Sequence, residues 1–331
     1  VCSSDLTTFT MSNNANKPNP KTSFSLSELL KEEKESIDCL VEPILPRCGL
    51  AALIGSSDSG KSTLLRQLAA SIVSKKPFLL WKTKSVQGKV LYISTEDEPE
   101  AISYLVKRQN KCWQLNAEAQ ERLEFVFDSD SLMYELNRRL HCERFDLVII
   151  DSLSDVFSGD INRMDVMREQ LRLFNQMAIR NRSLIVFLHH TRKSSDSDAP
   201  SKHNAIGSQG FEAKMRVVLE LRRNVNNSDL FHLCIVKGNY LSNEYKRASY
   251  DLTLTSDLCF EYTGERTPIE CLMPVIVPTC EKPKRGKTSQ EKKDEVIRLY
   301  NLGLNAKSIC EKMQLGRTRV YEILSEYRKQ S

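Results

Sequence analysis

Long apolar runs are missing from this sequence. The longest are residues 50–54, 147–150 and 184–188, whereas a membrane-spanning helix needs about 20 apolar residues. No charged segment followed by a long apolar one opens the chain, so we expect neither a membrane span nor a secretory signal. No internal repeat is found either.

Cysteine pairs at metal-ligand spacing are also absent. The ten cysteines are scattered, and none forms a Cys-x-x-Cys pair. This distribution is typical of reduced thiols, and it excludes a disulfide scaffold and the common zinc motifs. We therefore expect a cytoplasmic protein.

Basic residues are unevenly distributed. Residues 281–331 hold 13 Lys and Arg against 7 Asp and Glu, a net charge of +6, whereas the whole chain carries +5. The basic excess thus lies in the last fifty residues, which favours a tail that binds a polyanion. A solvated basic extension is the simpler alternative.

The first part of the chain has little sequence pattern. Residues 1–22 are polar and aperiodic, and we expect them to be disordered. The opening VCSSDL resembles a translated sequencing adaptor, so Met11 is our expected natural start. Ser25 or Ser27 is placed to cap a short helix through residues 29–34, with Glu28 completing the cap.

Strand-like and helix-like segments then alternate. This alternation predicts an α/β fold, with a mostly parallel sheet covered by helices on both faces. Expected strands are 49–54, 89–94, 123–127, 147–150 and 184–188, and expected helices are 62–74, 98–109, 131–142 and 164–180. Four further strands, 216–221, 230–236, 250–255 and 259–262, predict an antiparallel extension of the sheet.

A second domain follows. Residues 23–277 form the predicted core domain, and 278–288 are a Pro- and Lys-rich linker. In 289–331 apolar residues return at helical spacing, and they predict three short helices. The last two are joined by a tight turn, which is typical of a small all-α helix-turn-helix domain.

The strongest motif is a glycine-bounded loop between a strand and a helix. It matches the phosphate-binding loop G-x-x-x-x-G-K-[ST], whose backbone amides surround phosphate groups. Its residues, with the following threonine, are the expected ATP-binding set: Gly55, Ser56, Ser57, Asp58, Ser59, Gly60, Lys61, Ser62 and Thr63. Lys61 contributes a charge to the terminal phosphates, and Ser62 contributes a hydroxyl to Mg²⁺.

Two carboxylates follow neighbouring strands. Asp151 ends an apolar strand and is the expected second Mg²⁺ ligand, in the manner of a Walker B aspartate. Its alternative role is a helix cap. Glu96 follows another strand and is the expected general base for water, with Asp97 the less favoured choice. Alternatively, Glu96 only favours the start of the next helix.

A third strand ends in His189 and His190, whose side chains point to opposite faces if the strand continues. One of them is expected to contact the terminal phosphate. A structural pair is the alternative, and no third ligand nearby supports a metal site.

Together these strand ends resemble the RecA-like P-loop ATPases, and most of all the hexameric RepA-type replicative helicases of plasmids and mobile elements. The segment Gly207-Ser208 to Arg216 and the strand end Lys237-Gly-Asn-Tyr resemble that group as well. The resemblance covers about residues 30–265. It implies that Glu96 activates water, that His189 or His190 senses the phosphate, and that Arg216, less surely Lys237, reaches the nucleotide of a neighbouring subunit. It therefore implies a homo-oligomer, either a ring or a filament, and a hexameric ring is the expected form.

The C-terminal helices resemble instead the helix-turn-helix of resolvases and invertases. That resemblance implies that Arg317, Thr318 and Arg319 contact DNA from the start of the last helix. The cluster Lys284, Arg285 and Lys287 is expected to follow the DNA backbone or enter a minor groove. A helical protein-docking module is the alternative.

The sequence thus predicts a Mg²⁺-ATP-hydrolysing, RecA-like ATPase that handles DNA, as a replicative helicase of a plasmid or mobile element. One alternative is a RadA- or KaiC-like ATPase that does not unwind DNA. Another is a DNA-binding regulator of replication or transcription that is switched by ATP.

Overall fold

The computed structural model describes residues 23–31, 36–127, 132–156, 163–192, 198–206, 209–224, 226–272, 290–313 and 315–330. The chain divides into two compact units, Val1–Pro274 and Val275–Ser331. The predicted disordered segment 1–22 and the predicted linker 278–288 lie outside the described residues. Within the described ranges, no helix combines the length and apolar character needed to cross a membrane.

A nine-stranded sheet forms the centre of the first unit, as far as the chain is described. The strands pair in the order β12-β11-β10-β9-β3-β8-β7-β5-β6. Their bounds are β3 Gly49–Gly55, β5 Val90–Ser94, β6 Leu123–Val126, β7 Leu147–Asp151, β8 Leu184–His190, β9 Val217–Arg223, β10 Leu230–Gly238, β11 Tyr250–Leu254 and β12 Phe260–Tyr262. The block from β9 to β6 is parallel, and β10 to β12 are antiparallel. The predicted α/β fold, a mostly parallel sheet with an antiparallel extension, is confirmed.

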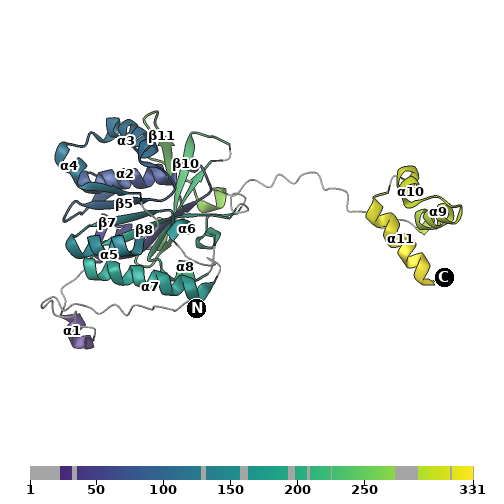
Figure 1. The fold of residues 1–331 in the computed structure, drawn as a ribbon, viewed down its shortest axis with the longest axis horizontal. Coiled ribbons are helices and arrows are strands. Elements are labelled where there is room, and N and C mark those ends of the chain that lie inside the picture. The colour runs from purple at the N-terminus through teal and green to yellow at the C-terminus, as the bar shows by residue number, and fades with distance from the viewer. Residues whose placement is uncertain are drawn as a thin grey trace, which may run out of the picture. The chain divides into compact units, whose positions relative to one another are not determined.

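Helices cover both faces of this sheet (Figure 1). One layer holds α2 Lys61–Ser74, α3 Pro99–Trp113 and α4 Ala117–Glu121, and the other holds α5 Leu132–Cys142 and α7 Met164–Asn181. Side chains of alternate β3 residues pack toward the two helix layers. Ala51 and Leu53 pack in the cluster that contains α2, whereas Ala52 and Ile54 pack in the cluster that contains α5 and α7. Both faces are therefore apolar, as the continuous apolar runs predict.

Several short elements have no counterpart in the predictions. A small antiparallel sheet joins β1 Cys39–Glu42, β2 Leu45–Pro46 and β4 Lys82–Thr83. The short helices α6 Leu153–Val156 and α8 Gln209–Lys214 are likewise unexpected. Two- to six-residue elements show too little periodicity to be detected.

The N-terminal helix has Ser25, one of the two predicted candidates, as its cap. Helix α1 spans Leu26–Leu30, and residues 32–34 of the predicted helix lie outside the described residues. Ser25 is the cap: its side chain accepts a hydrogen bond from the Glu28 amide, and the Glu28 side chain accepts one from the Ser25 amide. This reciprocal pair fixes the helix start.

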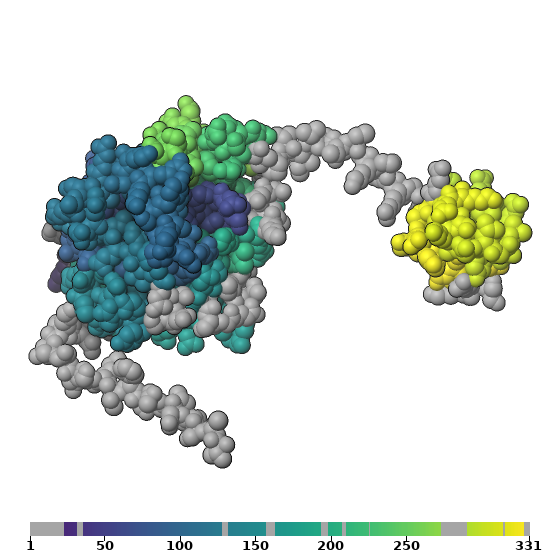
Figure 2. All heavy atoms as spheres, turned by 45° about the horizontal axis from the view of Figure 1, so that its top comes forward, coloured from purple at the N-terminus to yellow at the C-terminus, as the bar shows by residue number. Residues whose placement is uncertain are grey.

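The second unit is a three-helix body in its described part, drawn in yellow in Figure 2. Its helices are α9 Gln290–Asn301, α10 Ala306–Met313 and α11 Arg317–Gln330. Gly303, with a φ of +86°, follows α9, and the Asn305 side chain accepts the Ser308 amide hydrogen at the start of α10. One apolar cluster joins the helices: Val296, Leu299, Ile309, Val320, Ile323 and Leu324. The three predicted helices are therefore present around a separate core.

Candidate functional site

The glycine-bounded loop leaves the carboxyl end of β3 and leads directly into α2. A Cβ atom on Gly55 would collide with the carbonyl oxygen of Leu221 on the neighbouring strand. Gly60 has a φ of +85°, and a Cβ there would lie 2.8 Å from the ring of Phe260. Both glycines are therefore required by close packing, and the second also by its left-handed backbone.

A cavity of about 430 Å³ opens in front of this loop. It is lined by the loop and by residues that end or follow strands. The lining residues are Ser57, Asp58, Gly60, Lys61, Ser62, Thr63, Glu96, Leu188, His190, Arg223, Phe231 and Leu254. Of the predicted nucleotide-binding set, Gly55, Ser56 and Ser59 are not among the lining residues. The Ser59 hydroxyl donates to the Ser56 carbonyl at 2.8 Å within the loop.

Lys61 is a buried cation at the start of α2. Its Nζ donates to the Ser56 carbonyl at 2.7 Å, which folds the side chain over the loop. Burial lowers the pKa of Lys61, and the nearby Asp151, Glu96 and Asp58 oppose that shift. A buried cation beside a ring of backbone amides suits a polyanionic ligand.

Asp151 lies at the end of β7 and is buried. Burial raises its pKa, while hydrogen bonds from the Tyr92 and Ser62 side chains favour the charged form. The Tyr92 hydroxyl donates to Asp151 Oδ2 at 2.6 Å. The structure thus brings the two predicted Mg²⁺ ligands, Ser62 and Asp151, together.

These oxygen atoms fit Mg²⁺, which prefers one or two carboxylates together with substrate phosphates. Among the described residues there is no group of three His, Cys, Asp or Glu side chains that could hold a metal ion without such help. The cation would therefore bind here together with a phosphate-bearing ligand.

Glu96 and His190 both line the cavity and lie next to each other. The His190 Nε2 lies 3.5 Å from Glu96 Oε1. The β3–β8 register places His190 level with Gly55, and Glu96 follows two residues after Ser94, which is paired with Asp151. Parallel register therefore aligns all these strand ends.

Asp97, the less favoured base, is not among the cavity-lining residues.

His189 points away from the cavity into the core. Its Nε2–H donates to the Ile206 carbonyl at 2.6 Å, and its ring packs on Phe211. Burial lowers the pKa of His189 to about 4, so the ring is neutral. The predicted opposite orientation of the pair holds, and only His190 is placed to contact a ligand here.

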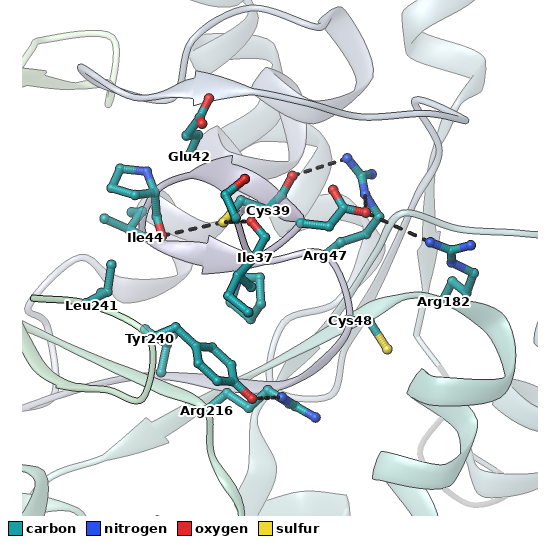
Figure 3. A pocket seen from close by; sticks show the side chains of 15 residues that line it. Ile37, Cys39, Glu42, Ile44, Arg47, Cys48, Arg182, Arg216, Tyr240 and Leu241 are labelled. Carbon is teal, nitrogen blue, oxygen red and sulfur yellow. Dashed lines mark hydrogen bonds and ion pairs between the residues drawn. The ribbon is translucent and has the colours of Figure 1, made fainter. Parts of the chain in front are cut away.

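Arg216 lies near the amino ends of the parallel strands, whereas this cavity lies at their carboxyl ends. Its amide donates to the Leu50 carbonyl at 2.8 Å, near the amino end of β3. Figure 3 shows its side chain beside Tyr240 in a second cavity, of about 710 Å³. Lys237 likewise lies away from the loop, where its Nζ donates to the Glu212 carbonyl at 2.6 Å. The structure does not bring either residue to the Lys61 site of the same chain.

The site includes residues that sequence reasoning missed. Arg223, Phe231 and Leu254 line the cavity, and the buried Tyr92 binds Asp151; all four belong to no motif and reach the site through strand pairing. Its position two residues after the predicted strand 216–221 is the one sequence signal that could have pointed to Arg223.

The predicted DNA-contacting residues are in the second unit. Lys284, Arg285 and Lys287 lie outside the described residues. Arg317 and Thr318 are exposed in the first turn of α11. Arg319 is partly buried, and its Nη1 donates to Glu322 Oε2 at 2.8 Å.

Comparison with known proteins gives one family match and several similar structures. A family model described as an AAA domain matches residues 16–196. The crystal structure of the RadB recombinase is 18% identical over 65% of this chain and 90% of that one, with a TM-score of 0.47. A second solved structure, an ATPase domain, is 10% identical over 65% of this chain and 85% of that one, with a TM-score of 0.49. No curated protein matches the chain.

Proposed function

Because the AAA domain model matches more than half of this chain, the chain belongs to that family, and we propose that it is a Mg²⁺-dependent ATPase that acts on DNA. One observation carries the proposal: the cavity at the P-loop gathers Lys61, Glu96 and His190, with the buried Asp151 behind Ser62. A cationic side chain, a Mg²⁺-binding pair and a carboxylate base are the groups that phosphoryl transfer to water requires.

Each of these side chains has a role in the proposed hydrolysis of ATP. ATP binds with its phosphates along the loop, and Lys61 exchanges the Ser56 carbonyl for a phosphate oxygen. Water attacks the γ-phosphorus while Glu96 accepts its proton, and the bond to the β–γ bridging oxygen breaks, so that ADP and phosphate leave. His190 donates to a γ-phosphate oxygen from its position beside Glu96. Ser62 and Asp151 would hold Mg²⁺, and that ion would supply positive charge against the negative charge that develops on the phosphates.

Arg216 and Lys237 act in this proposal across a subunit boundary. Both lie at the sheet edge opposite the P-loop of their own chain. In a ring of identical subunits, one edge faces the P-loop edge of the next copy, so these cations reach the neighbouring nucleotide and stabilise its transition state. We propose a hexameric ring, with hydrolysis dependent on assembly.

The second unit is proposed to bind duplex DNA through the start of α11, where Arg317 and Thr318 are exposed. Together with the ATPase unit this gives a replicative helicase of the RepA type, from a plasmid or mobile element. The alternative is a DNA-binding regulator whose assembly is switched by ATP. The separate apolar core of the second unit favours it, since such a unit can bind DNA without a motor.

The decisive experiment measures strand displacement, ATPase rate with and without single-stranded DNA, and mass in Mg²⁺-ATP. A helicase unwinds DNA in ATP, and Lys61→Ala abolishes unwinding and hydrolysis alike. Hydrolysis and sequence-specific duplex binding without unwinding would favour the regulator. Absence of nucleotide binding by the intact protein would refute both.

A further inference from the structure

We propose that Arg223, Phe231 and Leu254 form the site for the nucleobase, and that this site holds either purine by stacking, without reading its edge. The inference rests on the proposed ATPase function. It assigns the lining residues of the cavity that the P-loop leaves unexplained, and it predicts that the protein uses ATP and GTP alike.

The residues that line the cavity form two chemically different sets. One set is the P-loop with Lys61 and the residues at the ends of β5 and β8, where phosphates fit. Three other lining residues come from adjacent strands: Arg223 from β9, Phe231 from β10 and Leu254 from β11. A guanidinium, a phenyl ring and an isobutyl group offer flat or apolar surface, which suits a planar heterocycle rather than a phosphate.

Arg223 and Phe231 form a stacked pair. They are direct cross-strand partners in β9 and β10, and the Arg223 Cζ lies 5.1 Å from the centre of the Phe231 ring. The Arg223 side chain is exposed, and among the described residues no carboxylate forms an ion pair with it. The outer face of its guanidinium plane is thus open to a base, as in other arginine–base stacks.

This platform is fixed relative to the P-loop. Phe231 is buried and packs edge-on against Phe260, with ring centres 5.1 Å apart. The Gln67 side chain of α2 donates to the Phe260 carbonyl at 2.8 Å and accepts its amide hydrogen at 2.7 Å. The Phe260 ring in turn packs on Gly60. The two sets of lining residues are therefore held at a set separation.

Binding by stacking explains why we expect the site to accept both adenine and guanine. Every base has an aromatic face, so a guanidinium stack discriminates poorly between adenine and guanine. Strong discrimination needs buried groups that hydrogen-bond to the base edge, and Phe231 and Leu254 carry none. We expect ADP and GDP to bind with similar affinity, within about tenfold of each other.

The test compares ligands with and without a base. Calorimetry on the full chain in Mg²⁺ measures binding of ADP, GDP and inorganic pyrophosphate. Arg223→Ala is expected to weaken ADP and GDP binding by roughly five- to a hundredfold, and to leave pyrophosphate binding unchanged. Arg223→Lys keeps the charge but not the plane, so it should resemble Arg223→Ala. Arg266→Ala is the matched control, because Arg266 stacks on Tyr250, 4.5 Å from its ring centre, outside this cavity.

Three results would overturn the base site: unchanged ADP affinity in Arg223→Ala, an equal loss for pyrophosphate and ADP, or full rescue by Arg223→Lys. GDP binding more than a hundredfold weaker than ADP binding would refute the prediction that the site accepts both purines. Lys61→Ala should weaken all three ligands. If it weakens none of them, the proposed ATPase function fails, whatever the Arg223 variants show.

Discussion

Replacing Gly60 by alanine is expected to destabilise the folded protein in two ways. A left-handed backbone costs a non-glycine residue about 1–2 kcal/mol. Contact of the new Cβ with the Phe260 ring, at 2.8 Å, adds about 1–3 kcal/mol of overpacking. We therefore expect Gly60→Ala to lower the free energy of unfolding of the first unit by about 2–5 kcal/mol, and to weaken ADP binding because the loop shifts.

Gly264→Ala is the matched control, because Gly264 has a φ of +90° and nothing lies within 4 Å of its Cβ position. It should cost only the backbone part, about 1–2 kcal/mol. In a Phe260→Leu background the shorter side chain removes the collision, so Gly60→Ala should cost no more than Gly264→Ala does.

Denaturant titration followed by tryptophan fluorescence reports on the first unit alone, since both tryptophans, Trp81 and Trp113, lie in it. The predicted coupling between Gly60→Ala and Phe260→Leu is about 1–3 kcal/mol. If the two costs add to within about 0.5 kcal/mol, the packing argument is refuted.

Three further predictions concern separate parts of the chain. Glu96→Gln should slow ATP hydrolysis by about 10²–10⁴-fold with ADP affinity retained, and a normal steady-state rate would exclude Glu96 as the base. Because burial lowers the pKa of His189 from 6.5 to about 4, the unfolded chain binds more protons between these values. The free energy of unfolding is therefore unaffected by His189 above about pH 6.5, and protonation of His189 in the unfolded chain lowers it by about 3 kcal/mol toward pH 4. His189→Gln should lack this decline in denaturant titrations, and an unchanged pH profile would contradict it. Ile309→Ala, in the small core of the second unit, should lower the free energy of unfolding of that unit by about 2–5 kcal/mol. Circular dichroism should then show loss of helix, and duplex binding should be abolished while ADP affinity stays normal.

Part of the site could be predicted because its signals are local. A glycine-bounded loop followed by Lys61 and Ser62 defines a phosphate site within eight residues, and Asp151 is recognised because it ends a fully apolar strand. Glu96 and His190 also follow strands, and parallel strands end at one edge of a sheet. For these residues, predicting the strands is enough to predict their proximity.

The remainder depends on which strands are neighbours and in what register. Tyr92 binds Asp151 only because β5 and β7 are adjacent and aligned with Ser94 level with Asp151. The choice of His190 over His189 follows from which face of β8 packs on Phe211. Neither fact is encoded in a short stretch of sequence.

The amino-acid sequence by itself determined the alternation of strands and helices, the phosphate loop and the separate three-helix unit, because each follows from spacing within about twenty residues. Only the tertiary structure decided that Arg223, Phe231 and Leu254, contributed by three strands, share one cavity with Lys61. Contacts between segments distant in the chain are set by sheet order and packing, which no local pattern specifies.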